Sequence, residues 1–127
     1  MKLVVDSVTI FRDPADPFTG TLTPSTLLEE FGRWRERTPS QYQATGLSHL
    51  MTGRDLDGST VGIAYIDALC LRRFGASLSQ AAGIGSTTAA LVIAHELGHN
   101  FGAAHDGESG SVCESTPQTF LMAPRLN

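Results

Sequence analysis

The chain has 127 residues, of which 41% are hydrophobic and 17% are charged, and its formal net charge is −4 at pH 7. This length suffices for one buried core but not for two ordinary domains. The acidic balance and the dispersed arginines provide no basic surface for nucleic acid or for an anionic membrane, so neither partner is expected. No apolar run approaches the roughly 20 residues that span a bilayer, so a membrane span is not expected within these residues. Asp6 interrupts the only early apolar stretch, so a signal peptide is not expected within them either.

The first two predicted elements are a strand and a helix. Residues 2–11 are rich in valine and isoleucine and precede two Asp-Pro pairs, which favours a largely buried strand followed by an irregular loop. Thr23 can then cap a helix that has Pro24 at its first position. Apolar residues recur at helical spacing in Leu27, Phe31 and Trp34. This spacing predicts that the helix packs on a sheet, with the tryptophan in the core rather than at a ligand site.

Three short strands are predicted next, over residues 47–52, 61–66 and 76–80. Gly53 and the Asp57-Gly58 turn end the first of them. His49, the single histidine that lies far from the others, is interpreted as an ordinary residue of this strand rather than a ligand. The strand at 76–80 is short and polar, which is typical of a sheet edge.

A second helix is predicted over residues 88–100. Gly83 and Gly85 interrupt the chain before it, and Ser86 or Thr87 can supply its cap. Its buried side is expected to consist of Leu91, Ala94 and Leu97. Residues 107–118 are polar and rich in glycine and serine, so they are predicted to form a loop.

The end of this helix carries the string HExxHxxGxxH over residues 95–105. Residues four apart lie on one helix face, so His95 and His99 can bind the same metal ion. Glu96 is rotated by about 100° from the first histidine, which places its carboxylate beside the metal rather than on it. Gly102 can take a positive φ at little cost, and the turn it permits brings His105 back as a third ligand.

This ligand set indicates a catalytic metal. Three imidazoles with one open position are typical of catalytic zinc, whereas structural zinc sites have four protein ligands. Imidazole also binds Co²⁺, Ni²⁺ and Cu²⁺, so the residues alone leave these metals open. The simplest alternative is a helix with surface histidines and no metal. Glu96 is the candidate general base that would act on metal-bound water.

The string, together with Asp106 directly after it, resembles the metzincin zinc peptidases and specifically their reprolysin (adamalysin, ADAM-like) branch. The sequence FLMAP at 120–124 is similar to the family's Met-turn, with Met122 as its methionine. Upstream, LMTGRD at 50–55, GIAYI at 62–66 and Cys70 are similar to the stretch before the family's active-site helix. The resemblance covers roughly residues 47–126.

The resemblance implies an α/β, or α+β zincin-like, fold. Its twisted sheet would be mixed and mostly parallel with one antiparallel edge strand, accompanied by the active-site helix and the Met-turn. Residues 76–80 match the region that forms this edge above the cleft in the family. Residues 1–127 would be a single, incomplete catalytic domain. The family's domain has a strand and a helix before the position that matches Leu3, and a long helix after the Met-turn. The upper subdomain would span about 1–102, and 103–127 would begin the lower one.

The resemblance also implies a zinc-dependent endopeptidase, secreted or at the cell surface, that acts on protein or peptide substrates. An extended substrate would add to the sheet edge near Leu78 and Ser79. By analogy with the family, the wall of the pocket beyond the scissile bond would consist of Ala123, Pro124 and Arg125. Structural roles would fall to Gly102, Asp106 and Met122. The alternative reading is a non-catalytic zinc-binding or peptide-binding module, or an inactive fragment of such a domain.

Two further features bear on ions and redox state. Many relatives carry an acidic calcium ligand where this chain has Gly46, so a calcium site is not predicted. Cys70 and Cys113 are the two cysteines, and spacing alone does not decide whether they pair or stay free. Family members usually pair the cysteine matching Cys70 with one beyond the Met-turn.

Overall fold

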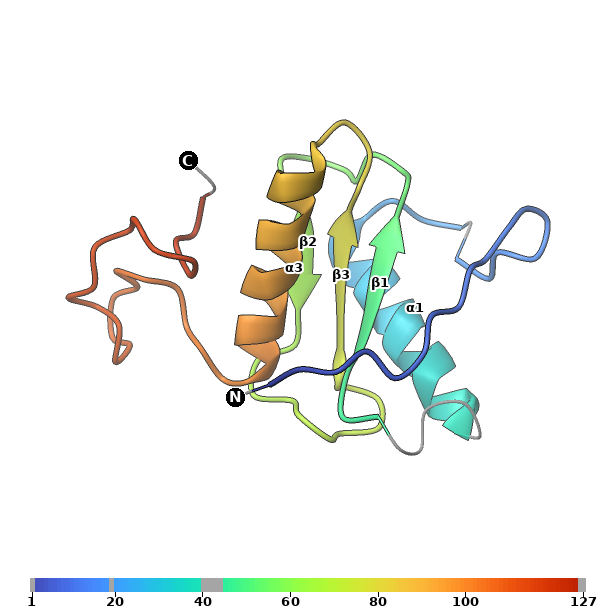
Figure 1. Cartoon of the computed structure of the whole chain (residues 1–127), viewed down its shortest axis with the longest axis horizontal. Helices are drawn as coiled ribbons and strands as arrows, with labels where there is room; N and C mark the ends of the chain where they lie inside the picture. The colour runs from blue at the N-terminus through green and yellow to red at the C-terminus, as the bar shows by residue number, and fades with distance from the viewer. Residues whose placement is uncertain (1, 19, 40–44, 126–127) are drawn as a thin grey trace.

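A three-stranded sheet lies between two helices, with α3 on one face and α1 on the other (Figure 1). The computed structural model describes residues 2–18, 20–39 and 45–125. None of the helices in these ranges is long and apolar enough to cross a membrane. The elements in chain order are α1 (Pro24–Arg37), β1 (Ser48–Thr52), β2 (Gly62–Ala64), β3 (Ala76–Gln80) and α3 (Ser86–Asn100).

The sheet is mixed, with the strand order β1-β3-β2. β1 runs parallel to β3 with Ser48 opposite Ala76, whereas β2 runs antiparallel to β3 with Ile63 opposite Leu78. The predicted positions of all three strands are therefore confirmed, as is a mixed sheet with one antiparallel edge strand. The prediction that residues 76–80 form this edge is wrong, because β3 lies in the centre and the antiparallel edge strand is β2.

The polar residues of β3 explain why its sequence resembles that of an edge. Ser77 and Ser79 are fully buried, and their hydroxyls lie 2.7 and 2.9 Å from the two ring nitrogens of His49 on β1. The imidazole can donate to one hydroxyl and accept from the other, so the buried polar groups are satisfied. Leu78 and Ser79 consequently have no exposed surface and no free strand edge, and the predicted substrate contact at these two residues is wrong.

Helix α1 begins and ends close to its predicted bounds and packs its apolar side on the sheet. Leu27, Leu28 and Phe31 are buried in the core, and Trp34 stacks on Phe31 with ring centroids 5.9 Å apart, so core packing of the tryptophan is confirmed. Thr23 occupies the N-cap position, but its side chain makes no capping hydrogen bond. Its hydroxyl instead donates to an Asp57 carboxylate oxygen at 3.2 Å, so the predicted side-chain cap is wrong.

Residues 2–11 do not form the predicted strand. The segment is extended past the sheet in Figure 1, and its apolar side chains are largely exposed, at 72–79% for Val4, Val5, Val8 and Ile10. A cavity of about 760 Å³ lies between this segment and β1. A strand requires a neighbour that pairs with its backbone N–H and C=O groups, and no strand of the described sheet pairs with residues 2–11.

Helix α3 is confirmed, but its cap and its buried side differ from the prediction. Gly85 is the N-cap residue, and neither Ser86 nor Thr87 makes a capping hydrogen bond. Leu91, expected to be buried, is 46% exposed. The side that faces the sheet is instead formed by Ala89, Val92, Glu96 and Asn100. These residues are three or four positions apart and form a stripe on roughly the opposite face of the helix from the predicted one, about 155° around its axis at 100° per residue.

The two cysteines are both free thiols. The backbone N–H of Cys70 donates to the Gly46 carbonyl at 3.0 Å, and the Cys113 carbonyl accepts from Gly107 at 2.8 Å. Each cysteine is thus held in a separate turn, and no disulfide joins them in this structure.

Candidate metal centre

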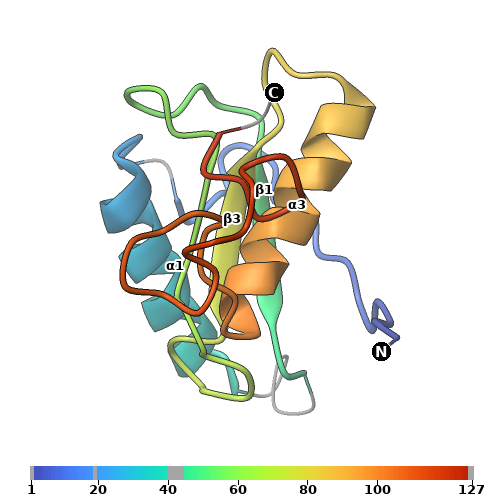
Figure 2. The same cartoon turned by 90° about the vertical axis from the view of Figure 1, so that its left-hand side faces the viewer.

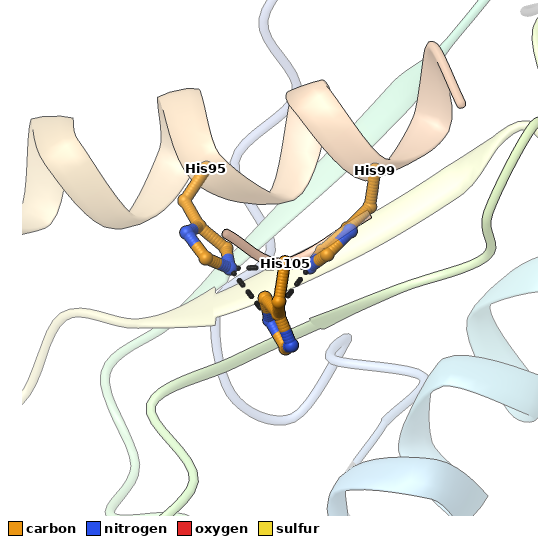
Figure 3. A group of neighbouring side chains, drawn as sticks. All are labelled: His95, His99 and His105. Carbon is orange, nitrogen blue, oxygen red and sulfur yellow. Dashed lines mark hydrogen bonds between the residues drawn. The ribbon is translucent and has the colours of Figure 1, made fainter. Parts of the chain in front are cut away.

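Three histidines converge on one point at the end of α3. His95 and His99 project from consecutive turns of the helix, and His105 approaches from the segment that follows it (Figure 3). The Nε2 atoms of His95 and His99 are 3.1 Å apart, and that of His105 lies 3.2 and 3.1 Å from them. Within the described ranges these three residues form the only group of histidine, cysteine or acidic side chains arranged to hold a metal ion.

The hydrogen bonds of the rings show that the cluster fits a cation. His95 Nδ1 lies 2.7 Å from the Leu121 carbonyl, and His99 Nδ1 lies 2.7 Å from the Ala103 carbonyl. A carbonyl only accepts, so each Nδ1 carries the proton and each Nε2 presents a lone pair. Lone pairs 3.1 Å apart repel unless they share a cation. Two nitrogens bound to tetrahedral zinc lie about 3.3 Å apart, which agrees with the observed spacing.

The third ligand is brought into place by a tight turn. Gly102 has a φ of +97°, a conformation that glycine adopts at little cost. Its N–H donates to the His99 carbonyl at 2.8 Å, and the next N–H, from Ala103, donates to Gly98 at 3.0 Å. These bonds end the helix and reverse the direction of the chain, which brings His105 back toward the helix face that carries His95 and His99.

Burial sets the protonation of the site. It lowers the pKa of His99 and of His105, which favours the neutral imidazole that binds metal. Glu108 opposes this shift weakly, and its carboxylate accepts a hydrogen bond from the backbone N–H of His105 at 3.2 Å. Glu96 is 6% exposed, and burial raises the pKa of its carboxyl group to about 7. A cation held at the three histidines would favour its ionised form.

The segment after the third histidine returns beneath α3. Residues 101–125 contain no helix or strand and lie to the left of α3 and β2 in Figure 1, and in front of the sheet in Figure 2. Met122 packs so closely under Gly98 that a Cβ atom at this glycine would lie 2.6 Å from the methionine sulfur. The Met122 carbonyl accepts from the N–H of Asp106 at 2.9 Å, and Asp106 is buried. The methionine therefore supports the helix turn between the first two histidines.

The remaining predicted site residues differ in their exposure to solvent. Ala123 is buried, whereas Pro124 and Arg125 are exposed just after Met122. Leu78 and Ser79 lie within the central strand and do not reach a surface that a substrate could contact.

Sequence reasoning missed two residues of the site. Gly62 lies on β2, where a Cβ atom would be 2.5 Å from Glu96 Oε1. Asn100, fully buried at the end of α3, donates from Nδ2 to the Tyr65 carbonyl at 2.8 Å and to the Ala76 carbonyl at 3.0 Å. A glycine inside a strand is a recognised signal of close approach by another group. No comparable local signal marks the asparagine, because its two acceptors are distant in the sequence.

We expect Asn100→Leu to lower the free energy of unfolding by about 1–3 kcal/mol, because the Tyr65 carbonyl would lose this donor and the Ala76 carbonyl would keep only the Tyr65 N–H at 3.4 Å. Urea unfolding of the metal-free protein measures this change without a contribution from zinc. Thr87→Leu, an exposed polar-to-leucine substitution on the same helix, is the matched control and should have little effect. Equal stability of the Asn100 variant and the parent chain would contradict the assignment.

Comparisons with known proteins agree with this geometry. The model of the reprolysin (M12B) family of zinc metalloproteases matches residues 1–126. The chain is 35% identical over 115 residues to snake venom metalloproteinase acutolysin-C from Deinagkistrodon acutus, covering 91% of this chain and 27% of that protein. It is 38% identical over 100 residues to snake venom metalloproteinase TM-1 from Protobothrops mucrosquamatus, covering 79% of this chain and 48% of the relative. The chain thus spans about a quarter to a half of the length of these relatives.

Proposed function

Because this chain belongs to the reprolysin (M12B) family of zinc metalloproteases, whose zinc is held by a cluster of three histidines, we propose that it forms part of a zinc-dependent endopeptidase. The observation that carries the proposal is the convergence of His95, His99 and His105, together with the buried Glu96 directly after the first of them on the same helix. This set combines the ligands for a catalytic metal with a candidate base, whereas a structural zinc site would need neither an open position nor a base.

Glu96 is proposed to move the proton during peptide hydrolysis. When bound, zinc would polarise the scissile carbonyl and make water a stronger acid. Glu96 would accept a proton from the attacking water and deliver it to the nitrogen of the leaving amine. Burial raises the pKa of its carboxyl group to about 7 in the metal-free chain, and a cation held at the three histidines would lower this pKa and favour the carboxylate that acts as base.

The free edge of β2 is the proposed binding place for an extended peptide. Val61 O and Tyr65 N bond to β3, so in this antiparallel ladder the N–H and C=O groups of Gly62 and Ala64 point away from the sheet. No strand among the described residues pairs with that edge. A substrate added there would gain backbone hydrogen bonds close to Glu96, which packs against Gly62.

The residues after Met122 are proposed to contact the substrate beyond the scissile bond. Pro124 and Arg125 are exposed and follow the segment that holds His95 through the Leu121 carbonyl. Ala123 is buried and would support them rather than meet much of the substrate. We also propose a secreted or cell-surface location, because the relatives compared above are named as venom proteins.

Metal removal tests the proposed function. We expect one zinc per chain, cleavage of an unfolded protein substrate such as casein, loss of cleavage to the background rate on chelation, and recovery on adding one equivalent of zinc. Metal content is measured in the same samples. Cleavage that persists without metal would refute the mechanism, and one bound zinc without cleavage would favour the non-catalytic binding module.

A further inference from the structure

Gly62 occupies a position in β2 where no side chain fits. A Cβ atom there would lie 2.5 Å from Glu96 Oε1, 2.8 Å from Val92 Cγ1 and 2.9 Å from Glu96 Cδ. Carbon atoms of real side chains essentially never come closer than 3.0 Å to such neighbours. Gly62 is not among the glycines with positive φ, so its backbone conformation does not require glycine. Glycine inside a strand is otherwise unfavourable, and the space is the remaining reason for it.

The two neighbours of this space differ in stiffness. Val92 is buried and β-branched, and its χ1 angle is restricted in a helix. The Glu96 carboxylate is the end of a flexible chain and can rotate away. A methyl group at position 62 would therefore strain the packing against Val92 and displace the carboxylate of Glu96. The two effects are separable, because one acts on stability and the other on the position of the proposed base.

We propose that Gly62 is a positioning residue for Glu96. Because glycine has no side chain, the Glu96 carboxylate can lie against the backbone of β2. The same residue directs its N–H and C=O groups to the free strand edge. One residue thereby places the base next to the proposed path of the substrate. This inference rests on the proposed peptidase function, which it deepens.

The primary test is Gly62→Ala in the zinc-loaded chain. We expect kcat to fall by about 10–100-fold, since a displacement of about 1 Å costs up to roughly 100-fold in rate. KM should change less than threefold, because alanine keeps the backbone groups of position 62, and zinc content should remain one per chain. Gly53→Ala is the matched control, because a Cβ atom there has no neighbour within 4 Å. A kcat within twofold of the parent value would overturn the inference.

Two double variants separate positioning from general damage. In a Glu96→Asp background the carboxylate is one methylene shorter, so Gly62→Ala should cost much less in kcat than it does in the parent chain. In Gly62→Ala/Val92→Ala the new methyl group can enter the space left by valine. The loss in Tm should then be smaller than the sum of the two single losses, while kcat stays low. Equal kcat losses in both backgrounds, or full recovery of kcat with Tm, would contradict a positioning role.

A measurement without activity keeps this inference distinct from the proposed function. If the parent chain shows no zinc-dependent cleavage, the proposed function fails, but the contact can still be tested in metal-free protein. Gly62→Ala should lower Tm by about 5–10 °C, and by less in a Glu96→Ala background where the carboxylate is gone. Identical losses in the two backgrounds would show that Gly62 does not accommodate Glu96.

Discussion

Replacing Glu96 with glutamine should lower kcat for peptide hydrolysis by about 10²–10⁴-fold, the range expected for loss of general acid–base catalysis. Glutamine has nearly the same shape as glutamate, so the packing against Gly62 and the sheet should persist. The glutamine amide cannot accept a proton from water, so the substitution removes only the function of the side chain as a base. Initial rates on a quenched fluorescent peptide, measured with saturating zinc, determine the change.

The metal should stay bound in this variant, because the three ligands are histidines and Glu96 is not one of them. One zinc per chain in both proteins is therefore the required companion measurement. Glu36→Gln, which removes an exposed carboxylate from α1, is the matched control and should leave kcat unchanged. Retention of kcat in the Glu96 variant would refute its role as base, and loss of zinc would show that it holds the metal.

The second large effect is expected for His49 in acid. Burial lowers the pKa of its imidazole from 6.5 to about 4 in the folded chain. Below pH 6.5 the unfolded chain takes up a proton at this residue and the folded chain does not, so the free energy of unfolding falls as the pH drops. The fall amounts to about 3 kcal/mol by pH 4, because each unit of pKa difference corresponds to about 1.4 kcal/mol.

His49→Gln should remove this part of the acid sensitivity. An amide can still donate to one of the two serine hydroxyls and accept from the other, but it does not titrate. Urea unfolding of metal-free protein at pH 7 and pH 4.5 measures the difference. The two proteins differ only at position 49, so the comparison isolates His49. A decrease in stability of the same size in parent and variant would rule out His49 as the source.

Local sequence patterns were sufficient to predict much of the fold and the metal centre of this protein. Helical spacing places His95 and His99 on one face, and a glycine that tolerates positive φ returns His105, so the three metal ligands lie within eleven residues. Helix α1 and the positions of the three strands also follow from apolar spacing and turn residues. These features require only the geometry of a single element or a single turn, which nearby residues determine.

Strand order and side-chain partners depended on the tertiary structure. The serines of β3 indicated an edge, yet β3 is central, paired with β1 and β2, and His49, about thirty residues earlier in the chain, lies within hydrogen-bond distance of both hydroxyls. The valine-rich segment at 2–11 has strand composition but no pairing partner across the cavity beside β1. The space for the Glu96 carboxylate comes from a glycine on another element. Each outcome depends on pairing between segments distant in sequence, which the periodicity of a single segment does not encode.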